Sequence, residues 1–411
     1  MALSTIFLAI LFFYSLGSQR LERTVVTAPI FFTVAGAAIS FLLPEMDDGK
    51  GSLGLFLRLA EVGLVLLLFT EASRTDLALL KNIQNLPARL LSAGMLLTIL
   101  LGAVAALVIF RQLTLWEAGI LAAILAPTDA GLGQVIVNSE RVPIKIREAL
   151  SVEAGLNDGL SVPFLLFFIG LAGDEKTARS AGLSRFIMEQ LGLGVVIGVA
   201  IGIAGGFLLR FARDRNWMSR FFEELAVVTL PLLSILASET VGASMFIAAF
   251  VAGLVLQVNL KGIEKHGLEF SEEWGQLLNL SVFFLFGVFL ARQWGNLSVS
   301  FFLYAVLSLT VVRMLPVAIA LIGTRLHRST VFFMGWFGPR GLASIVLGLV
   351  YLEQDSHHPG ESIIHFAVMA TVLLSIFAHG ISAQPGIKLY AAKIDSLGLD
   401  APERRLPGEE R

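Results

Sequence analysis

The sequence predicts an all-α polytopic membrane protein with about 13 transmembrane helices, and three observations lead to this fold class. The chain has 411 residues, of which 56% are hydrophobic and only 15% are charged, which is too apolar for a soluble protein of this length. Apolar segments recur along the whole chain. The polar connections between them are short. Because lipid requires backbone polar groups to be satisfied within each segment, we expect every one of these segments to be helical.

Composition excludes several kinds of function. The chain has no cysteine, which excludes a disulfide, a thiolate metal site and a cysteine nucleophile. Its six histidines lack the HExxH type of spacing, and the net charge of −2 offers no basic field for nucleic acid. We therefore expect no bound cofactor and no nucleic-acid partner. The first charged residue is Arg20, so we interpret the first apolar run as a mature span rather than a cleavable signal.

The apolar segments, taken in order, define the expected helices. Thirteen are candidates for crossing the membrane, and their approximate cores are residues 3–17, 24–43, 53–70, 88–110, 115–137, 143–171, 186–212, 221–238, 243–258, 275–291, 297–322, 331–352 and 362–383. Most of the basic residues lie in connections that are cytoplasmic if the N-terminus is outside. This bias supports an odd number of spans with a cytoplasmic C-terminus. The residues after about Gln384 are expected to form a charged stub.

Two of these helices should be broken. The fifth segment contains Ala126–Gly133 (APTDAGLG), and the twelfth contains Gly335–Gly341 (GWFGPRG). Proline removes a helix hydrogen bond and glycine weakens a helix, so each stretch predicts an interruption. The breaks lie seven segments apart, as an inverted repeat of segments 1–6 and 8–13 would give. Paired broken helices indicate the midplane site of a transporter. Two ordinary proline kinks with snorkelling charges are the alternative.

The sixth segment carries carboxylates inside the apolar core. Glu153 and Asn157 are four residues apart and share one helix face, while Asp158 lies about 100° further round. Acids at this depth are costly and are functional by default. Arg313, in the eleventh segment, needs an anion, and Glu153 is its first candidate partner. The alternative is a buried ion pair that only fixes helix packing.

The remaining charged residues of the spans admit simpler interpretations. Arg58 and Glu61 are three residues apart and are expected to pair on one helix face. Glu71, Arg74 and Asp76 could line an ion entrance, and a solvated helix end is the alternative. His365 and His379 are expected to be packed or interfacial rather than proton relays.

Several motifs resemble those of the monovalent cation/proton antiporters, specifically the prokaryotic NhaP-type sodium/proton antiporters related to the animal sodium/hydrogen exchangers. The resemblance covers nearly the whole chain and is carried by Phe69–Arg74 (FTEASR), Ala126–Asp129 (APTD), Glu153–Asp158 (EAGLND), Arg313, Gly338–Gly341 (GPRG) and His379–Ala383 (HGISA). It implies a homodimer in a bacterial or archaeal cytoplasmic membrane. Each protomer would exchange protons for a monovalent cation, Na⁺ first, with Li⁺ or K⁺ as alternatives.

The resemblance also implies a division of the chain and a role for each site residue. Residues 1–87 and 172–296, including a linker helix, would form a dimerisation domain; 88–171 and 297–383 an ion-translocation core; and 384–411 a cytoplasmic tail. Asp158 would bind the cation or the proton, beside Asp129 and Thr128. The supporting residues would be Asn157 at the crossing, the buried ion pair of Glu153 and Arg313, and Arg340 at the second break.

Two details of the resemblance bear on the transported ion. An Asn-Asp pair, here Asn157 and Asp158, goes with electroneutral exchange in this family. Ala154 and Ala130 stand where many relatives have serine and proline. One oxygen ligand must therefore come from water, Ser151 or a backbone carbonyl.

Other functions have less support. A K⁺/H⁺ antiporter is the nearest alternative. A cation channel would need a carbonyl filter that the sequence does not contain. An intramembrane aspartyl protease could use Asp129 and Asp158, but no independent protease motif accompanies them, so we expect a transporter rather than an enzyme.

Overall fold

The structure is a computed structural model, and it describes residues 2–21, 24–42, 51–74, 85–173, 182–259, 265–353, 359–398 and 401–404. These residues are helical apart from turns and short connections, and none of them lies in a strand. The elements, in chain order, are α1 (Ala2–Leu21), α2 (Ala28–Leu42), α3 (Gly51–Arg74), α5 (Asn85–Arg89), the π-helix η1 (Leu90–Gly94), α6 (Met95–Ile109), α7 (Leu115–Ile124), α8 (Ala130–Val137), α9 (Ile144–Ala172), α11 (Gly182–Asp214), α12 (Arg220–Val241), α13 (Met245–Asn259), α14 (Lys265–Gln293), the 3₁₀ helix η2 (Trp294–Asn296), α15 (Val299–Leu309), α16 (Val311–Ala320), α17 (Arg328–Trp336), α18 (Leu342–Glu353) and α19 (Glu361–Asp395).

The helices have the length and composition of a membrane protein. Within the described ranges, 8 helical stretches are long and apolar enough to cross a bilayer, and shorter apolar helices include α2, α7, α13 and α18. The all-α membrane class is therefore confirmed. The count of 13 spans and the inverted repeat stay predictions.

Both expected helix breaks are present. α7 ends at Ile124 and α8 begins at Ala130, and α17 ends at Trp336 while α18 begins at Leu342. A third interruption was not expected. Thr310, between α15 and α16, has φ −106° and ψ −91°, and its hydroxyl donates to the carbonyl of Val306 at 2.5 Å. This bond of a threonine side chain to the preceding turn competes with the regular helix ladder and is known to bend helices.

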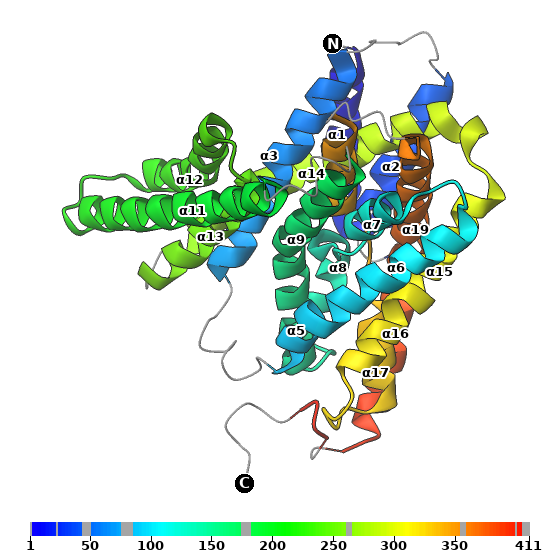
Figure 1. Ribbon diagram of the computed structural model, residues 1–411. Helices are drawn as coiled ribbons and strands as arrows, with labels where there is room; N and C mark the ends of the chain where they lie inside the picture. Colours follow the sequence, from blue (N-terminus) through cyan, green and yellow to red (C-terminus); the bar gives the residue numbers. More distant parts are fainter. Residues whose placement is uncertain are drawn as a thin grey trace.

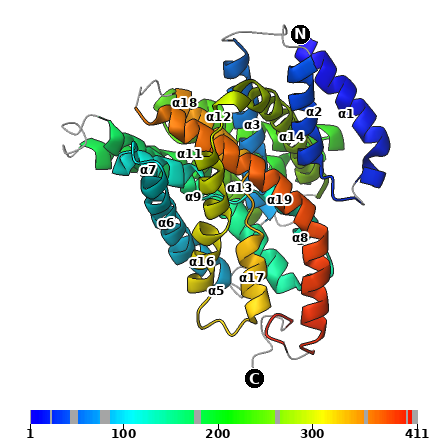
Figure 2. The ribbon, with the colours of Figure 1, turned by 90° about the vertical axis from the view of Figure 1, so that its right-hand side faces the viewer.

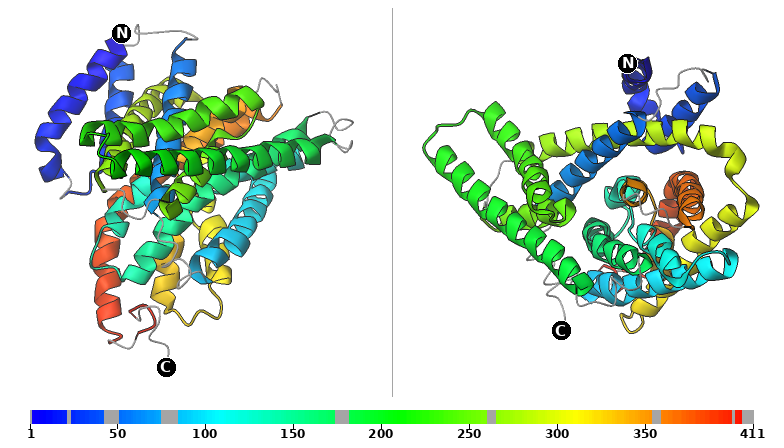
Figure 3. Two further views of the ribbon diagram at one scale, coloured as in Figure 1. Left: turned by 90° about the vertical axis from the view of Figure 1, so that its left-hand side faces the viewer. Right: turned by 45° about the horizontal axis from the view of Figure 1, so that its top comes forward.

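Helices α2 and α14 lie in backbone contact. A Cβ at Gly36 would overlap the carbonyl oxygen of Phe284, and one at Gly287 would overlap that of Thr33. Glycine is therefore required for this close approach. Helices α11, α12 and α13 form a group at one side of the molecule, whereas α8, α9 and α19 lie further inside (Figures 1 and 3). The start of α1 and the end of α19 lie at opposite ends of the molecule (Figure 2).

The C-terminal part corrects the expectation of a charged stub after Gln384. Helix α19 continues to Asp395, and the ring of Tyr390 stacks on Phe333 with centroids 4.1 Å apart. Glu403 is 1% exposed and accepts hydrogen bonds from the backbone N–H of His327 at 2.7 Å and the hydroxyl of Thr330 at 2.8 Å. Packing against α17 therefore extends the ordered helix well past the apolar core of the segment.

Candidate functional site

Asp129 joins the two broken helices where they cross. It is the N-cap of α8, and its Oδ1 accepts from the backbone N–H of Leu132 at 2.9 Å. Its Oδ2 accepts from the N–H of Leu342, the first residue of α18, and its own N–H donates to the carbonyl of Pro339 at 2.8 Å. One carboxylate thus caps the positive ends of both half-helices.

Arg340 makes the reciprocal contact. Its side chain is fully buried, and Nη1 donates to the carbonyls of Ala126 and Pro127 at 2.8 Å each. These carbonyls follow the C-terminal end of α7, where the helix dipole is negative. An acid from one break and a base from the other therefore meet the facing helix ends.

Asn157 connects α9 to the first break. Its Nδ2 donates to the hydroxyl of Thr128 at 2.8 Å, and its Oδ1 accepts from the backbone N–H of Thr128 at 3.2 Å. Both atoms of the amide are therefore used, and they hold the residue that precedes Asp129. This pairing fixes the orientation of Thr128 beside the acids of α9.

Glu153 and Arg313 form the expected pair. Nη1 of Arg313 lies 2.6 Å from Oε1 of Glu153, and both side chains are less than 5% exposed, at 4% and 3%. Gly338 lies directly against the guanidinium, because a Cβ at this position would overlap it. The ion pair therefore packs against the residues of the second break.

The expected pair on α3 is also present. Arg58 pairs with Glu61 at 3.2 Å, and it pairs with Glu239 of α12 at 2.7 Å, a partner that the sequence did not indicate.

Asp158 differs from the other central acids. It is 7% exposed, and within the described part of the chain its buried Oδ1 has no hydrogen-bond partner. Glu153 is held by Arg313, and Asp129 is held by backbone N–H groups. Within the described part of the chain, Asp158 therefore has a buried carboxylate oxygen that neither an arginine nor a helix end holds.

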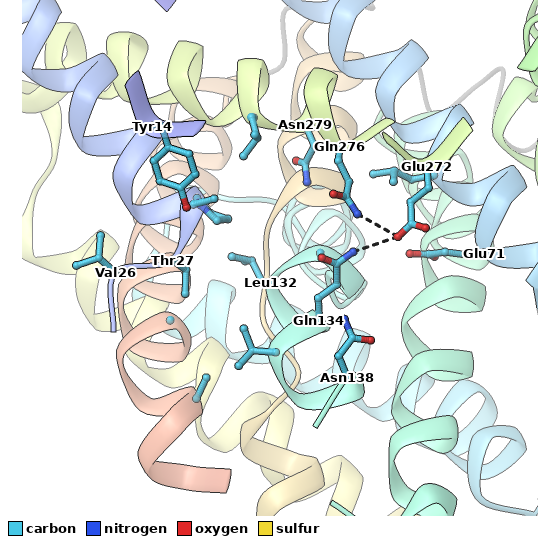
Figure 4. Close-up of a pocket in the computed structure, with 18 of the residues that line it drawn as sticks. Tyr14, Val26, Thr27, Glu71, Leu132, Gln134, Asn138, Glu272, Gln276 and Asn279 are labelled. Carbon is cyan, nitrogen blue, oxygen red and sulfur yellow. Dashed lines mark hydrogen bonds between the residues drawn. The ribbon is translucent and has the colours of Figure 1, made fainter. Parts of the chain in front are cut away.

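Two cavities approach this region from either side of α8. One, of about 180 Å³, is lined by residues that include Thr128, Asp129, Ser151 and Ala154. The other, of about 530 Å³, lies between α8, α14 and the start of α2, and Figure 4 shows it with Asn279 and Leu132 at its wall. Both cavities are lined by Glu71, Arg74, Gln134, Asn138 and Glu272.

The shared wall of the cavities contains residues that sequence reasoning missed. Glu272 pairs with Arg74 and accepts from Gln276 Nε2 at 3.0 Å and Gln134 Nε2 at 3.5 Å (Figure 4). Glu272 precedes the apolar core of its segment, so no local pattern marked it. Glu71, considered for an entrance, has Oε2 3.0 Å from the position that a Cβ on Gly155 would take. Asp76 lies outside the described residues.

Helical spans, crossed broken helices and a buried carboxylate with an unpartnered oxygen define the class of a membrane transporter. Residues 4–388 match the family described as sodium/hydrogen exchanger, transmembrane. The chain belongs to this family, and it is accordingly a cation/proton antiporter rather than an enzyme. Its membership of the monovalent cation/proton antiporters, expected from the motifs, is thereby confirmed.

Individual relatives agree with this assignment. The chain is 24% identical over 327 residues to a Na⁺/H⁺ antiporter of Schizosaccharomyces pombe, covering 71% of this chain and 68% of that protein. It is 25% identical over 293 residues to the K⁺/H⁺ antiporter NhaP2 of Shewanella sp. MR-4, covering 68% of this chain but only 48% of that protein.

A solved structure has the same fold. The sodium proton antiporter MjNhaP1 from Methanocaldococcus jannaschii superposes with a TM-score of 0.78 and 19% identity, over 96% of this chain and 97% of that one. At this identity the likeness concerns the arrangement of helices, and the roles of individual residues need their own argument.

Proposed function

We propose that this chain exchanges one proton for one monovalent cation, Na⁺ first, and that Asp158 is the group that carries either of them. The observation that carries the proposal is the open Oδ1 of Asp158 among acids that are otherwise held. A carboxylate cannot hold a proton and a cation on the same oxygens, so the two compete. Alternating exposure of Asp158 to the two sides of the membrane then couples their movements.

The neighbours of Asp158 supply the rest of the cation site. Thr128 and Asp129 line the smaller cavity and would contribute oxygen atoms, while Asn157 keeps Thr128 in place. Glu71 reaches the turn of α9 that precedes Asp158 and would add another oxygen. Ala154 offers none, but Ser151 lines the same cavity, so we assign the missing ligand to Ser151 or water.

We further propose that the core (88–171 and 297–383) moves against a dimerisation domain (1–87 and 172–296) in a homodimer. Close helix contacts support this division. Within the second unit, Gly36 and Gly198 face backbone carbonyls on neighbouring helices. At the border, Gly131, Gly155 and Gly380 face side chains of the other unit instead, which can yield during a movement. The opposite placement of the ends of α1 and α19 supports an external N-terminus and a cytoplasmic tail (Figure 2).

A K⁺/H⁺ exchanger is the second candidate. The observation in its favour is Ala154, since a site with one fixed oxygen fewer leaves more room and more water around the ion. A relative of similar identity is named a K⁺/H⁺ antiporter. The residues around Asp158 would be the same in both cases.

Proteoliposomes with an imposed pH gradient test both candidates. Purified protein is challenged with Na⁺, Li⁺, K⁺ and Rb⁺, and dissipation of the gradient is recorded. We expect Na⁺ and Li⁺ to be active and Asp158→Asn to be inactive, while Asp214→Asn, at an exposed ion pair on α11, behaves like the wild type. Exchange by folded Asp158→Asn protein would refute the assignment of the carrier, and a response to K⁺ alone would favour the second candidate.

A further inference from the structure

The crossing of the broken helices leaves four buried helix ends, and the residues already described account for three of them. Asp129 caps the N-terminal ends of α8 and α18, and Arg340 binds the carbonyls after the C-terminal end of α7. The C-terminal end of α17 remains. Its last carbonyl, that of Trp336, accepts from the backbone N–H of Gly338 at 2.9 Å, and a carbonyl oxygen has a second lone pair for another donor.

His379, on α19, supplies this donor. It is 2% exposed, and its Nε2 lies 2.8 Å from the carbonyl oxygen of Trp336. A carbonyl can only accept, so the hydrogen of this bond must be on Nε2. The indole of Trp336 is itself held, because its Nε1 donates to the hydroxyl of Ser382 at 2.9 Å. The ring therefore meets the end of α17 in a defined geometry.

The other ring nitrogen of His379 leads to Arg340. Nδ1 lies 3.1 Å from the hydroxyl oxygen of Ser375 and 3.0 Å from the carbonyl oxygen of Ser375, and the hydroxyl oxygen accepts from the backbone N–H of Arg340 at 2.6 Å. That carbonyl lies within helix α19, where the backbone N–H of His379 is its regular partner, so it needs no hydrogen from Nδ1. If Nε2 carries the only ring hydrogen, Nδ1 accepts and the hydroxyl of Ser375 donates to it. A neutral imidazole then satisfies both ring nitrogens. A neutral ring is also the form that costs least in a fully buried place beside an arginine.

We propose that His379 is a positioning residue of the ion site, acting as a neutral imidazole that fixes the second break. It rests on the proposed function, since the site it positions is the proposed cation site. The ring joins Trp336, the last residue of α17, to Arg340, inside the break. Arg340 in turn holds the carbonyls of Ala126 and Pro127, which precede Thr128. His379 therefore sets the position of a proposed cation ligand through three successive contacts.

The first test is the protonation state of the ring, which needs no transport. Protein labelled with ¹⁵N-histidine is studied by magic-angle-spinning NMR in lipid, and the spectrum of His379→Gln assigns the signal of His379. We expect one neutral ring with hydrogen on Nε2, unchanged between about pH 6 and pH 9, the range over which an ordinary histidine titrates. A ring that becomes doubly protonated in this range, or that carries its hydrogen on Nδ1, would overturn the proposal.

The second test separates positioning from a proton relay. In His379→Gln the amide N–H can still donate to the carbonyl of Trp336, so we expect the rate, the Na⁺ KM and the pH profile of the wild type. In His379→Phe the donor is lost at similar volume, and we expect the Na⁺ KM to rise about tenfold, the effect of one lost hydrogen bond in a buried site. His365→Phe is the matched control, a histidine of the same helix in an apolar cavity, and should be unchanged.

The outcomes decide between the alternatives. A relay predicts that His379→Gln fails or shifts its pH profile as much as His379→Phe does, and this result would refute positioning. Should His379→Phe not fold, Ser375→Ala removes the hydroxyl between the ring and Arg340 and should raise the KM in the same direction; an unchanged KM would then refute the proposal. If wild-type protein exchanges no cation, the proposed function fails, while the NMR result still decides the state of the ring.

Discussion

Removing Arg313 should destabilise the protein far more than removing an arginine from a surface pair. Nη1 of Arg313 lies 2.6 Å from Oε1 of Glu153, and Glu153 Oε2 already lacks a partner in the described chain. Arg313→Met therefore leaves a buried carboxylate without its one hydrogen-bond donor there. Loss of one partner from a buried pair costs about 3–5 kcal/mol of unfolding free energy.

An exposed ion pair provides a control for Arg313→Met, and a double variant should restore the stability that this change removes. Arg210 pairs with Asp214 on α11, and the two side chains are 65% and 60% exposed, so Arg210→Met should cost less than about 1 kcal/mol. The double variant Glu153→Gln with Arg313→Met removes both charges, and it should recover most of the stability lost by the single change.

Denaturant and thermal unfolding in detergent micelles measure these differences. We expect the order wild type, Arg210→Met, the double variant and Arg313→Met, from most to least stable. A melting temperature of Arg313→Met equal to that of the wild type would show that the contact contributes nothing to stability. A double variant no more stable than Arg313→Met would show that the unpaired carboxylate is not the cause of the loss.

The remaining predictions concern the crossing, the coupling and the C-terminal segment. Gly338→Ala should lower stability and transport together, because its Cβ would overlap the guanidinium of Arg313; wild-type transport by this variant would contradict the contact. Exchange of Na⁺ should be indifferent to a K⁺/valinomycin potential, since Asp158 alone changes state and no net charge moves; each charge that did move would add about 2.3 kcal/mol per 100 mV. A steady dependence of rate on the potential would mean that a second acid titrates, with Asp129 the first suspect. Glu403→Ala should lower unfolding free energy by about 1 kcal/mol through loss of the cap on α17, and an unchanged unfolding midpoint in denaturant would exclude that role.

The sequence allowed the breaks and the central ion pair to be predicted, and local chemistry explains why. Pro127 and Pro339 have no backbone N–H, so each removes a helix hydrogen bond whatever the tertiary structure. Glu153 and Arg313 are opposite charges deep in apolar segments, where each needs a partner. Such constraints are present in the residues themselves, before any tertiary contact forms.

The features that escaped prediction depend on contacts between distant segments. Thr310 interrupts its helix, although no proline or glycine stands at that position. Helix α19 continues past Pro385, where the ring of Tyr390 stacks on Phe333 of another helix. Glu272 is an ordinary polar residue until Arg74 and Gln134 come near it. The carbonyl that accepts from His379 Nε2 belongs to Trp336 in α17, so the residues that surround His379 in the sequence of α19 did not indicate this hydrogen bond.

The exchange of caps between the two broken helices has a consequence for biosynthesis. Asp129 accepts a hydrogen bond from the N–H of Leu342, 213 residues later in the chain. The carbonyl of Ala126 accepts one from Arg340, 214 residues later. When the first broken helix leaves the ribosome, Leu342 and Arg340 have not yet been synthesised. Until then Oδ2 of Asp129 lacks the N–H of Leu342, and the carbonyls of Ala126 and Pro127 lack Arg340. The crossing therefore reaches its final form only after the last helices have been inserted.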